Sequence, residues 1–284
     1  MIRNPFSVTP NEVASAAVML KQGASLVLVV EGESDEMLIS RHTDRSKLGF
    51  VIASGKNNAI AVARILDRGA ASDEIKVLVD RDLDGARGVG SRVITTAYWD
   101  LDSEVLGSTD ILHQLYLAFK RERYPHSLDR LVRETARISS PLSSLFVVSH
   151  RRGLGLAVAR LSMSAIDDES TLESQVRSLL TQALAKTNNA GSKDLVQVDS
   201  LVKEVVDHAE SISSSLEGHQ GHILHIALAR MLGKGVKPDL VQSFVWASLS
   251  LDQFRATPVA SKLEDWCQQS GESIWIGAAA DVAA

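Results

Sequence analysis

The chain has 284 residues, of which 45% are hydrophobic and 23% are charged, so it can form one large globular domain or two small ones. Its formal net charge of −5 argues against a protein that binds nucleic acid over its whole surface, although a local basic groove is still allowed. Aromatic residues make up only 5%, which leaves few side chains for stacking on single-stranded bases.

The cysteine content and hydropathy of the sequence indicate in which cellular compartment the protein is expected. Cys267 is the only cysteine, so an internal disulfide is excluded and a reducing environment is expected. The first residues lack the apolar segment of a signal peptide, and no stretch approaches the ~20 apolar residues that span a bilayer. We therefore expect a cytoplasmic protein with no membrane association.

The first predicted elements are a helix over residues 9–23 and a strand over residues 26–30. Thr9 is a capping residue, Pro10 suits the first helical position, and Glu12 can complete a capping box. The five consecutive apolar residues of the strand are typical of a central parallel strand that is buried on both faces. This strand ends abruptly at Glu31.

Helical and strand patterns then alternate along the chain. The predicted elements are a helix over 35–43, a strand over 49–53, a helix over 58–67, and strands over 75–79 and 92–97. Such alternation predicts βαβ units, a parallel sheet with flanking helices and right-handed crossovers, which is an α/β fold.

After about residue 105 the pattern becomes largely helical. Helices are predicted over 107–122, 127–150, 169–186, 194–215, 221–233, 237–250 and 258–270, and the segment 154–161 could add a short strand. The simplest division is an α/β domain of residues 1–110 and a helical domain of residues 111–284.

One polar residue follows each predicted strand of the first half. Glu31, Lys56, Asp80 and Asp100 stand at or just beyond these four strand ends. In parallel α/β sheets, ligands bind at the carboxyl ends of the strands. We therefore expect these four side chains to lie at one edge of the sheet and to form a site.

The acidic residues of this edge predict a divalent metal ion. Carboxylates that crowd together repel one another, and a bound cation removes that repulsion. Hard oxygen ligands suit Mg²⁺ or Mn²⁺, and Lys56 could contact a phosphate group. The predicted ligands are Glu31, Asp35, Asp80, Asp82 and Asp84. Two of them have simpler alternatives, because Asp35 could cap a helix and Asp84, before Gly85, could belong to a turn.

Three other motifs share features with this sequence. Asp80, Asp82 and Asp84 match the start of an EF-hand loop, but Ser91 stands where a bidentate Glu is needed, and a strand precedes the loop. Phosphohydrolases that form an aspartyl phosphate usually carry Asp-x-Asp on their first strand, whereas here the motif follows the third predicted strand. A response-receiver domain needs an acidic pair after its first strand and would leave the helical half unexplained.

The sequence resembles the signature of the toprim family. The resemblance lies in the E-G-x-x-D pattern from Glu31 to Asp35 and in the D-x-D pattern of Asp80 and Asp82, and it covers about a third of the chain. Toprim domains occur in topoisomerases, primases, recombination factors and OLD-type nucleases. The resemblance implies a toprim-like fold, Mg²⁺ binding by these acids and action on phosphodiester bonds.

A narrower resemblance extends over more of the chain. The segments 54–58, 98–104 and 218–222 are similar to a group of toprim-like proteins that join such a domain to a helical half. Some members are anti-phage effectors that work beside an ABC-type ATPase and cut nucleic acid, including transfer RNA. This resemblance implies metal-ligand or general-base roles for Glu31, Asp80 and Asp82, and it implies that Lys56, Asp100 and Glu104 line the site. We expect Lys56 to take part in catalysis as well, and the expected substrate-binding residues are Lys56, Arg81, Asp100 and Glu104.

These patterns lead to three hypotheses. The first is a Mg²⁺-dependent nuclease of DNA or RNA with an ATPase partner. The second is a catalytically quiet toprim-like module that binds a partner, and the third is a phosphotransfer enzyme with Asp80 as nucleophile. Assembly into a homo-oligomer is compatible with all three. The histidines at 219, 222 and 225 have a spacing that could bind a metal, although packed or solvent-facing roles are commoner.

Overall fold

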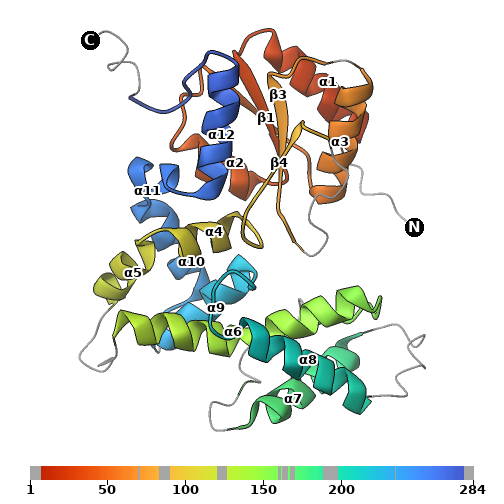
Figure 1. Ribbon diagram of the computed structural model, residues 1–284, viewed down its shortest axis with the longest axis vertical. Helices are drawn as coiled ribbons and strands as arrows, with labels where there is room; N and C mark the ends of the chain where they lie inside the picture. Colours follow the sequence, from red (N-terminus) through yellow and green to blue (C-terminus); the bar gives the residue numbers. More distant parts are fainter. Residues whose placement is uncertain are drawn as a thin grey trace. The chain divides into compact units, whose positions relative to one another are not determined.

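The structure, a computed structural model, describes residues 8–69, 71–82, 90–119, 127–158, 161, 166, 170–187, 198–233 and 235–277 (Figure 1). Contacts divide the chain into two compact units: Met1–Thr109 with Leu249–Ala284, and Asp110–Ser248. The C-terminal segment thus belongs to the unit that contains the sheet. This differs from the helical domain of residues 111–284 that the sequence suggested.

The first unit contains a parallel sheet, as predicted. Its four described strands lie in the order β2 (Leu48–Ile52), β1 (Leu26–Val30), β3 (Ile75–Val79) and β4 (Val93–Thr95). Strand β1 pairs with a neighbour on each side, and all five of its side chains have no exposed surface. Its uninterrupted apolar sequence is therefore explained by burial on both faces and both edges.

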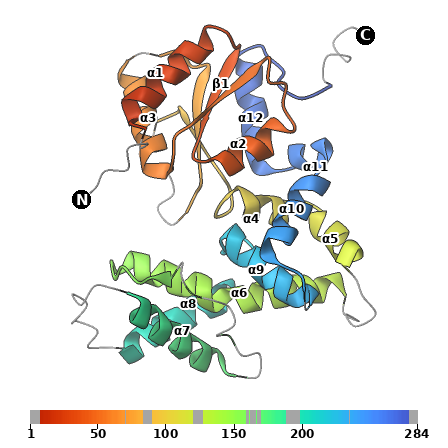
Figure 2. The ribbon, with the colours of Figure 1, turned by 180° about the vertical axis from the view of Figure 1, so that it is seen from behind.

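Helices cover both faces of this sheet (Figures 1 and 2). Helices α1 (Pro10–Lys21) and α3 (Lys56–Arg68) cover one face, and α2 (Glu33–Ser40) and α12 (Pro258–Gln269) cover the other. Alternate side chains of β1 and β3 pack against α1 and α3 in one hydrophobic core, as the two-residue period of a strand requires. The predicted capping box of Thr9 and Glu12 begins α1.

The C-terminal segment joins this unit through aromatic packing and backbone pairing. Phe254, on α11 (Leu251–Arg255), is fully buried and stacks on His42 with ring centroids 4.8 Å apart. The Ile276 N–H donates to the His42 carbonyl, and the Asp44 N–H donates to the Ile274 carbonyl. Sequence periodicity contains no signal for such long-range pairing.

The second unit is helical, as expected for this part of the chain. It contains α5 (Ile111–Phe119), α6 (Leu128–Arg151), α7 (Leu172–Lys186), α8 (Val198–Ile212), α9 (Gly221–Leu232) and α10 (Pro238–Ser248). Side chains of α6, α7, α8 and α9 share one core. No helix in the described part of the chain combines the length and apolar character needed to cross a bilayer.

Two details differ from the sequence-based elements. The predicted helix over 107–122 corresponds to the end of α4 (Leu101–Ser108) and to α5, because Thr109 has an extended backbone that ends α4. The part of the segment 154–161 that is described contains no strand.

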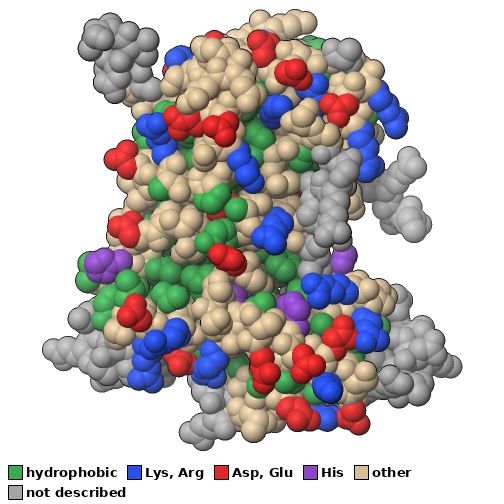
Figure 3. Space-filling view, viewed as in Figure 1, with side chains coloured by type: hydrophobic (Ala, Val, Ile, Leu, Met, Phe, Trp, Pro, Cys, Tyr) green, Lys and Arg blue, Asp and Glu red, His purple; other side chains and the backbone are tan. Residues whose placement is uncertain are grey.

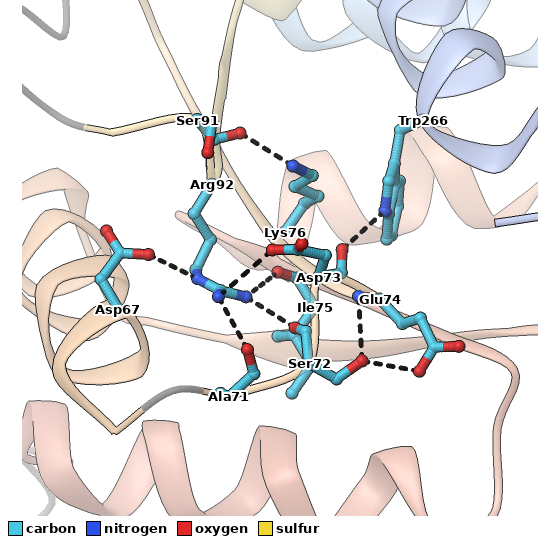
Figure 4. A network of polar contacts seen from close by, with 10 residues as sticks. All are labelled: Asp67, Ala71, Ser72, Asp73, Glu74, Ile75, Lys76, Ser91, Arg92 and Trp266. Carbon is cyan, nitrogen blue, oxygen red and sulfur yellow. Dashed lines mark hydrogen bonds and ion pairs between the residues drawn. The ribbon is translucent and has the colours of Figure 1, made fainter. Parts of the chain in front are cut away.

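The amino ends of β3 and β4 are joined by a buried arginine (Figure 4). Arg92, which is 5% exposed, donates from its guanidinium to the carbonyls of Ala71, Ser72 and Ile75 at 2.7–2.9 Å and to Asp67 Oδ1 at 2.8 Å. One planar group with five N–H donors thus satisfies several backbone acceptors at the beginning of β3. This network fixes the edge of the sheet opposite to the predicted site.

We predict that Arg92→Lys lowers the free energy of unfolding by about 2–4 kcal/mol, because an ammonium group cannot reach all of these acceptors. Urea unfolding followed by circular dichroism measures the change. Arg45→Leu is the control, since it removes a cation that is 66% exposed and paired with Glu36 in the same unit. Equal unfolding midpoints for Arg92→Lys and the wild type would contradict this assignment.

Candidate acidic site at the carboxyl ends of the strands

The carboxyl ends of β1 and β3 bring Glu31 and Asp80 together. The two strands are neighbours in the sheet, and each acid directly follows the last residue of its strand. The backbone N–H of Asp80 donates to Glu31 Oε1 at 2.8 Å. The predicted convergence of these two acids is therefore present in the structure.

Burial makes the charged forms of both acids costly. The pKa of Asp80 is raised to about 9, first by desolvation and then by the negative charges of Asp100, Asp35, Glu31 and Asp82. Desolvation likewise raises the pKa of Glu31 to about 7, although the hydrogen bond from the Asp80 N–H opposes the rise. The charge of Lys56 also lowers the pKa of Glu31, but it is the last of the contributions in size. Such values are typical of acids whose burial is only partly compensated.

Asp35 both caps a helix and belongs to this acidic group. Its Oδ2 accepts the backbone N–H of Gly32 at 3.0 Å, where it begins α2. Its pKa is nevertheless raised to about 6, mainly by burial, with further contributions from the charges of Asp102 and Asp100. The two alternatives that the sequence left open for Asp35 are thus compatible with each other.

Lys56 faces the same group from the first position of α3, just beyond the end of β2. Its Nζ lies 3.0 Å from Asp82 Oδ2 and 3.3 Å from the Arg81 carbonyl oxygen. The turn before it contains Ser54 and Gly55, both with positive φ, and the Gly55 N–H donates to the Glu31 carbonyl. This turn therefore ties Lys56 to the strand that carries Glu31.

The backbone of Arg81 and Asp82 is held by the loop after β4. The Arg81 N–H donates to Thr96 Oγ1 at 2.8 Å, and the Asp82 N–H donates to the Trp99 carbonyl at 3.0 Å. Asp82 has a φ of 43°, a left-handed conformation that Asp tolerates better than most residues do. The exposed Arg81 side chain donates to the Ala97 carbonyl at 2.6 Å.

The remaining predicted residues lie in different settings. Asp100 caps α4 by accepting the Ser103 N–H at 2.8 Å, and its charge acts on Asp80 and Asp35. Glu104 has no exposed surface, and its carboxylate accepts backbone N–H groups. In this structure it offers no surface to a substrate. Asp84 lies outside the described residues.

The chemistry of this donor set suits a hard cation, but its geometry is not that of a formed metal site. All the converging ligands are carboxylates, which Mg²⁺ and Mn²⁺ prefer. Within the described residues, no three Asp, Glu, His or Cys side chains are grouped so that they could hold a metal ion. Binding would therefore require these carboxylates to reorient toward the ion.

Sequence reasoning missed Asp102 and Thr96. Asp102 lies in the first turn of α4, and its negative charge raises the pKa of Asp35. Its position in the first helical turn after a predicted strand is the sequence signal that could have identified it. Thr96 follows β4 and acts through its hydroxyl, for which the sequence contains no signal. The histidine alternative gains no support, because both ring nitrogens of His219 are hydrogen-bonded, to Ser143 Oγ and to the Ile212 carbonyl.

We predict that Asp80→Asn stabilises the metal-free protein by about 1–2 kcal/mol at pH 8. Since the pKa of Asp80 is higher in the folded state than in the unfolded state, the folded state retains a proton that the unfolded state loses. The contribution of Asp80 to the free energy of unfolding therefore falls as pH rises from about 4 to 9. The neutral amide of Asn removes this loss. Urea unfolding in EDTA at pH 8 and pH 5 tests the prediction.

The exposed Asp265 of the same unit provides the control Asp265→Asn, for which we expect no such gain. The benefit of Asp80→Asn should be smaller at pH 5, where Asp80 is already protonated in the folded protein. A loss of stability in this variant at pH 8 would contradict the account of charge repulsion.

Comparison with known proteins does not assign the chain. No protein-family model matches it, and no curated protein sequence matches it. The chemistry of the acidic edge is thus the principal basis for a functional proposal.

Proposed function

We propose that the protein is a Mg²⁺-dependent nuclease of toprim type that hydrolyses phosphodiester bonds of DNA or RNA. The observation that carries the proposal is the convergence of Glu31, Asp35 and Asp80 with raised pKa values at the carboxyl edge of a parallel sheet. A divalent cation is the natural compensation for such a group. The order of the motifs, with a Glu after β1 and D-x-D after the adjacent β3, agrees with the toprim resemblance.

Particular residues would hold the ion and the substrate. Glu31 and Asp80 would be the principal ligands, with Asp35 and Asp82 beside them. When bound, the ion would supply Lewis-acid stabilisation of a phosphate oxygen and activation of water. Lys56 would exchange its contact with Asp82 for a substrate phosphate once the ion engages that carboxylate, and Arg81 presents an exposed cation at the same edge.

The substrate class rests on phosphate chemistry and on the resemblance. On the face drawn in Figure 3, acidic and basic side chains are interspersed, with no broad basic area. Local contacts such as those of Lys56 and Arg81 would position the backbone of a nucleic acid. The role in phage defence and the ATPase partner are proposals that the resemblance alone supports. The cytoplasmic location is a proposal from the single cysteine and the hydropathy of the sequence.

One observation favours the quiet binding module as a second candidate. Lys56 forms an ion pair with Asp82, and Glu31 accepts the Asp80 N–H. A module that uses such internal contacts could retain the fold without turnover. Against this, the hydrogen-bond partner of Glu31 Oε1 is a backbone amide, and the pKa of the side chain stays raised to about 7, as expected for a carboxylate that a cation would stabilise.

The test is cleavage of labelled DNA and of total transfer RNA by the wild type, Glu31→Gln and Asp80→Asn in Mg²⁺, in Mn²⁺ and in EDTA. We expect metal-dependent cleavage by the wild type and a loss of about 100-fold or more in both variants, because each removes a ligand of the ion. Asp265→Asn is the matched control and should cleave at the wild-type rate.

Unchanged cleavage in both variants would place the activity elsewhere or in a contaminant. Absence of cleavage by every protein, including the wild type with added Mn²⁺, would favour the binding module. Transfer of a labelled phosphoryl group to the protein, lost in Asp80→Asn, would instead favour a phosphotransfer enzyme with Asp80 as its nucleophile.

A further inference from the structure

The loop of residues 96–99 determines where the D-x-D segment lies. It supplies the acceptors for the backbone N–H groups of Arg81 and Asp82, and for the Arg81 side chain. The Thr96 hydroxyl donates in turn to the Tyr98 carbonyl at 3.0 Å. Any displacement of this loop would therefore move the backbone that carries the second acid of the motif.

Glu104 holds this loop from inside α4. Its Oε2 accepts the Ala97 N–H, and the Tyr98 N–H also donates to its carboxylate. The side chain is 0% exposed, so the carboxylate needs these donors to offset the loss of water. Gly107 permits close approach on the same helix, because a Cβ at that position would overlap the Tyr98 ring.

The same carboxylate reaches the C-terminal segment. Glu104 Oε1 accepts the Val259 N–H, which lies in the first turn of α12. A carboxylate at a helix N-terminus interacts favourably with the helix dipole. Lys262, one turn further along α12, donates to the Thr95 carbonyl at 2.6 Å at the end of β4. Two segments about 155 residues apart in sequence thus meet at one buried side chain.

We infer that Glu104 is a positioning residue that couples the N-terminus of α12 to the D-x-D segment through the loop of residues 96–99. It acts through backbone donors, in contrast to the substrate contact that the family resemblance implies. The consequence for catalysis rests on the proposed function. The mechanical coupling does not, because it follows from contacts within one compact unit.

The test is amide hydrogen exchange, resolved by residue, in the wild type and in Glu104→Gln. Glutamine has the volume of glutamate but places an NH₂ group against a backbone N–H donor. We expect exchange at Arg81, Asp82 and Ala97 to accelerate about 10-fold, while exchange at Leu28 and Val29 in β1 stays unchanged. The same opening should reach Val259 in α12.

Two further variants distinguish coupling from general destabilisation. Thr96→Val removes the acceptor of the Arg81 N–H directly, so it should accelerate exchange at Arg81 while leaving Val259 protected. Arg92→Lys weakens the opposite edge of the sheet and should accelerate exchange throughout the unit. If Glu104→Gln does not fold, Gly107→Ala tests the same loop by displacing the Tyr98 ring.

Uniform acceleration in Glu104→Gln, as in Arg92→Lys, would overturn the inference, and so would unchanged exchange at Arg81 and Asp82. Local acceleration would support it even if the wild type neither binds Mn²⁺ nor cleaves nucleic acid. In that case the proposed function would fail while the coupling would stand.

Discussion

Repulsion among partly buried carboxylates is the main physical constraint on the first unit, because the rest of the unit must hold these acids together. Glu31 and Asp80 must lie together because β1 and β3 are parallel, hydrogen-bonded neighbours that both end at the carboxyl edge of the sheet. Replacement of either acid by a neutral residue would relieve the repulsion at no cost to the hydrophobic core. Acids in such a setting reduce stability, and proteins accept this cost mainly where function needs it.

The rest of the unit holds these acids in place. At the amino ends of the strands, Arg92 satisfies backbone carbonyls and fixes β3 beside β4. At the carboxyl ends, the loop of residues 96–99 holds Arg81 and Asp82, and Glu104 holds the loop. The opposite edge therefore supplies rigidity, whereas the site edge combines a rigid backbone with side chains that a cation could reorient.

The local parts of this arrangement were predictable from sequence. The apolar run of β1 predicted a parallel sheet, and the acids after β1 and β3 predicted that these side chains meet at its carboxyl edge, because parallel strands all end at the same edge. The return of the C-terminal segment to the sheet unit was not predictable, since contacts such as Phe254 on His42 leave no periodic signal. The burial of Glu104 was missed for the same reason: its partners include Val259, far along the chain.

Proton release on metal binding tests the central claim most directly. Titration of Mn²⁺ at pH 7, by calorimetry in buffers of different ionisation enthalpy, gives both the stoichiometry and the protons displaced. We predict that about one ion binds with release of about one to two protons, because Asp80 and Glu31 must deprotonate to become ligands. Release should be smaller in Asp80→Asn. Absence of Mn²⁺ binding, or binding without proton release, would contradict the account.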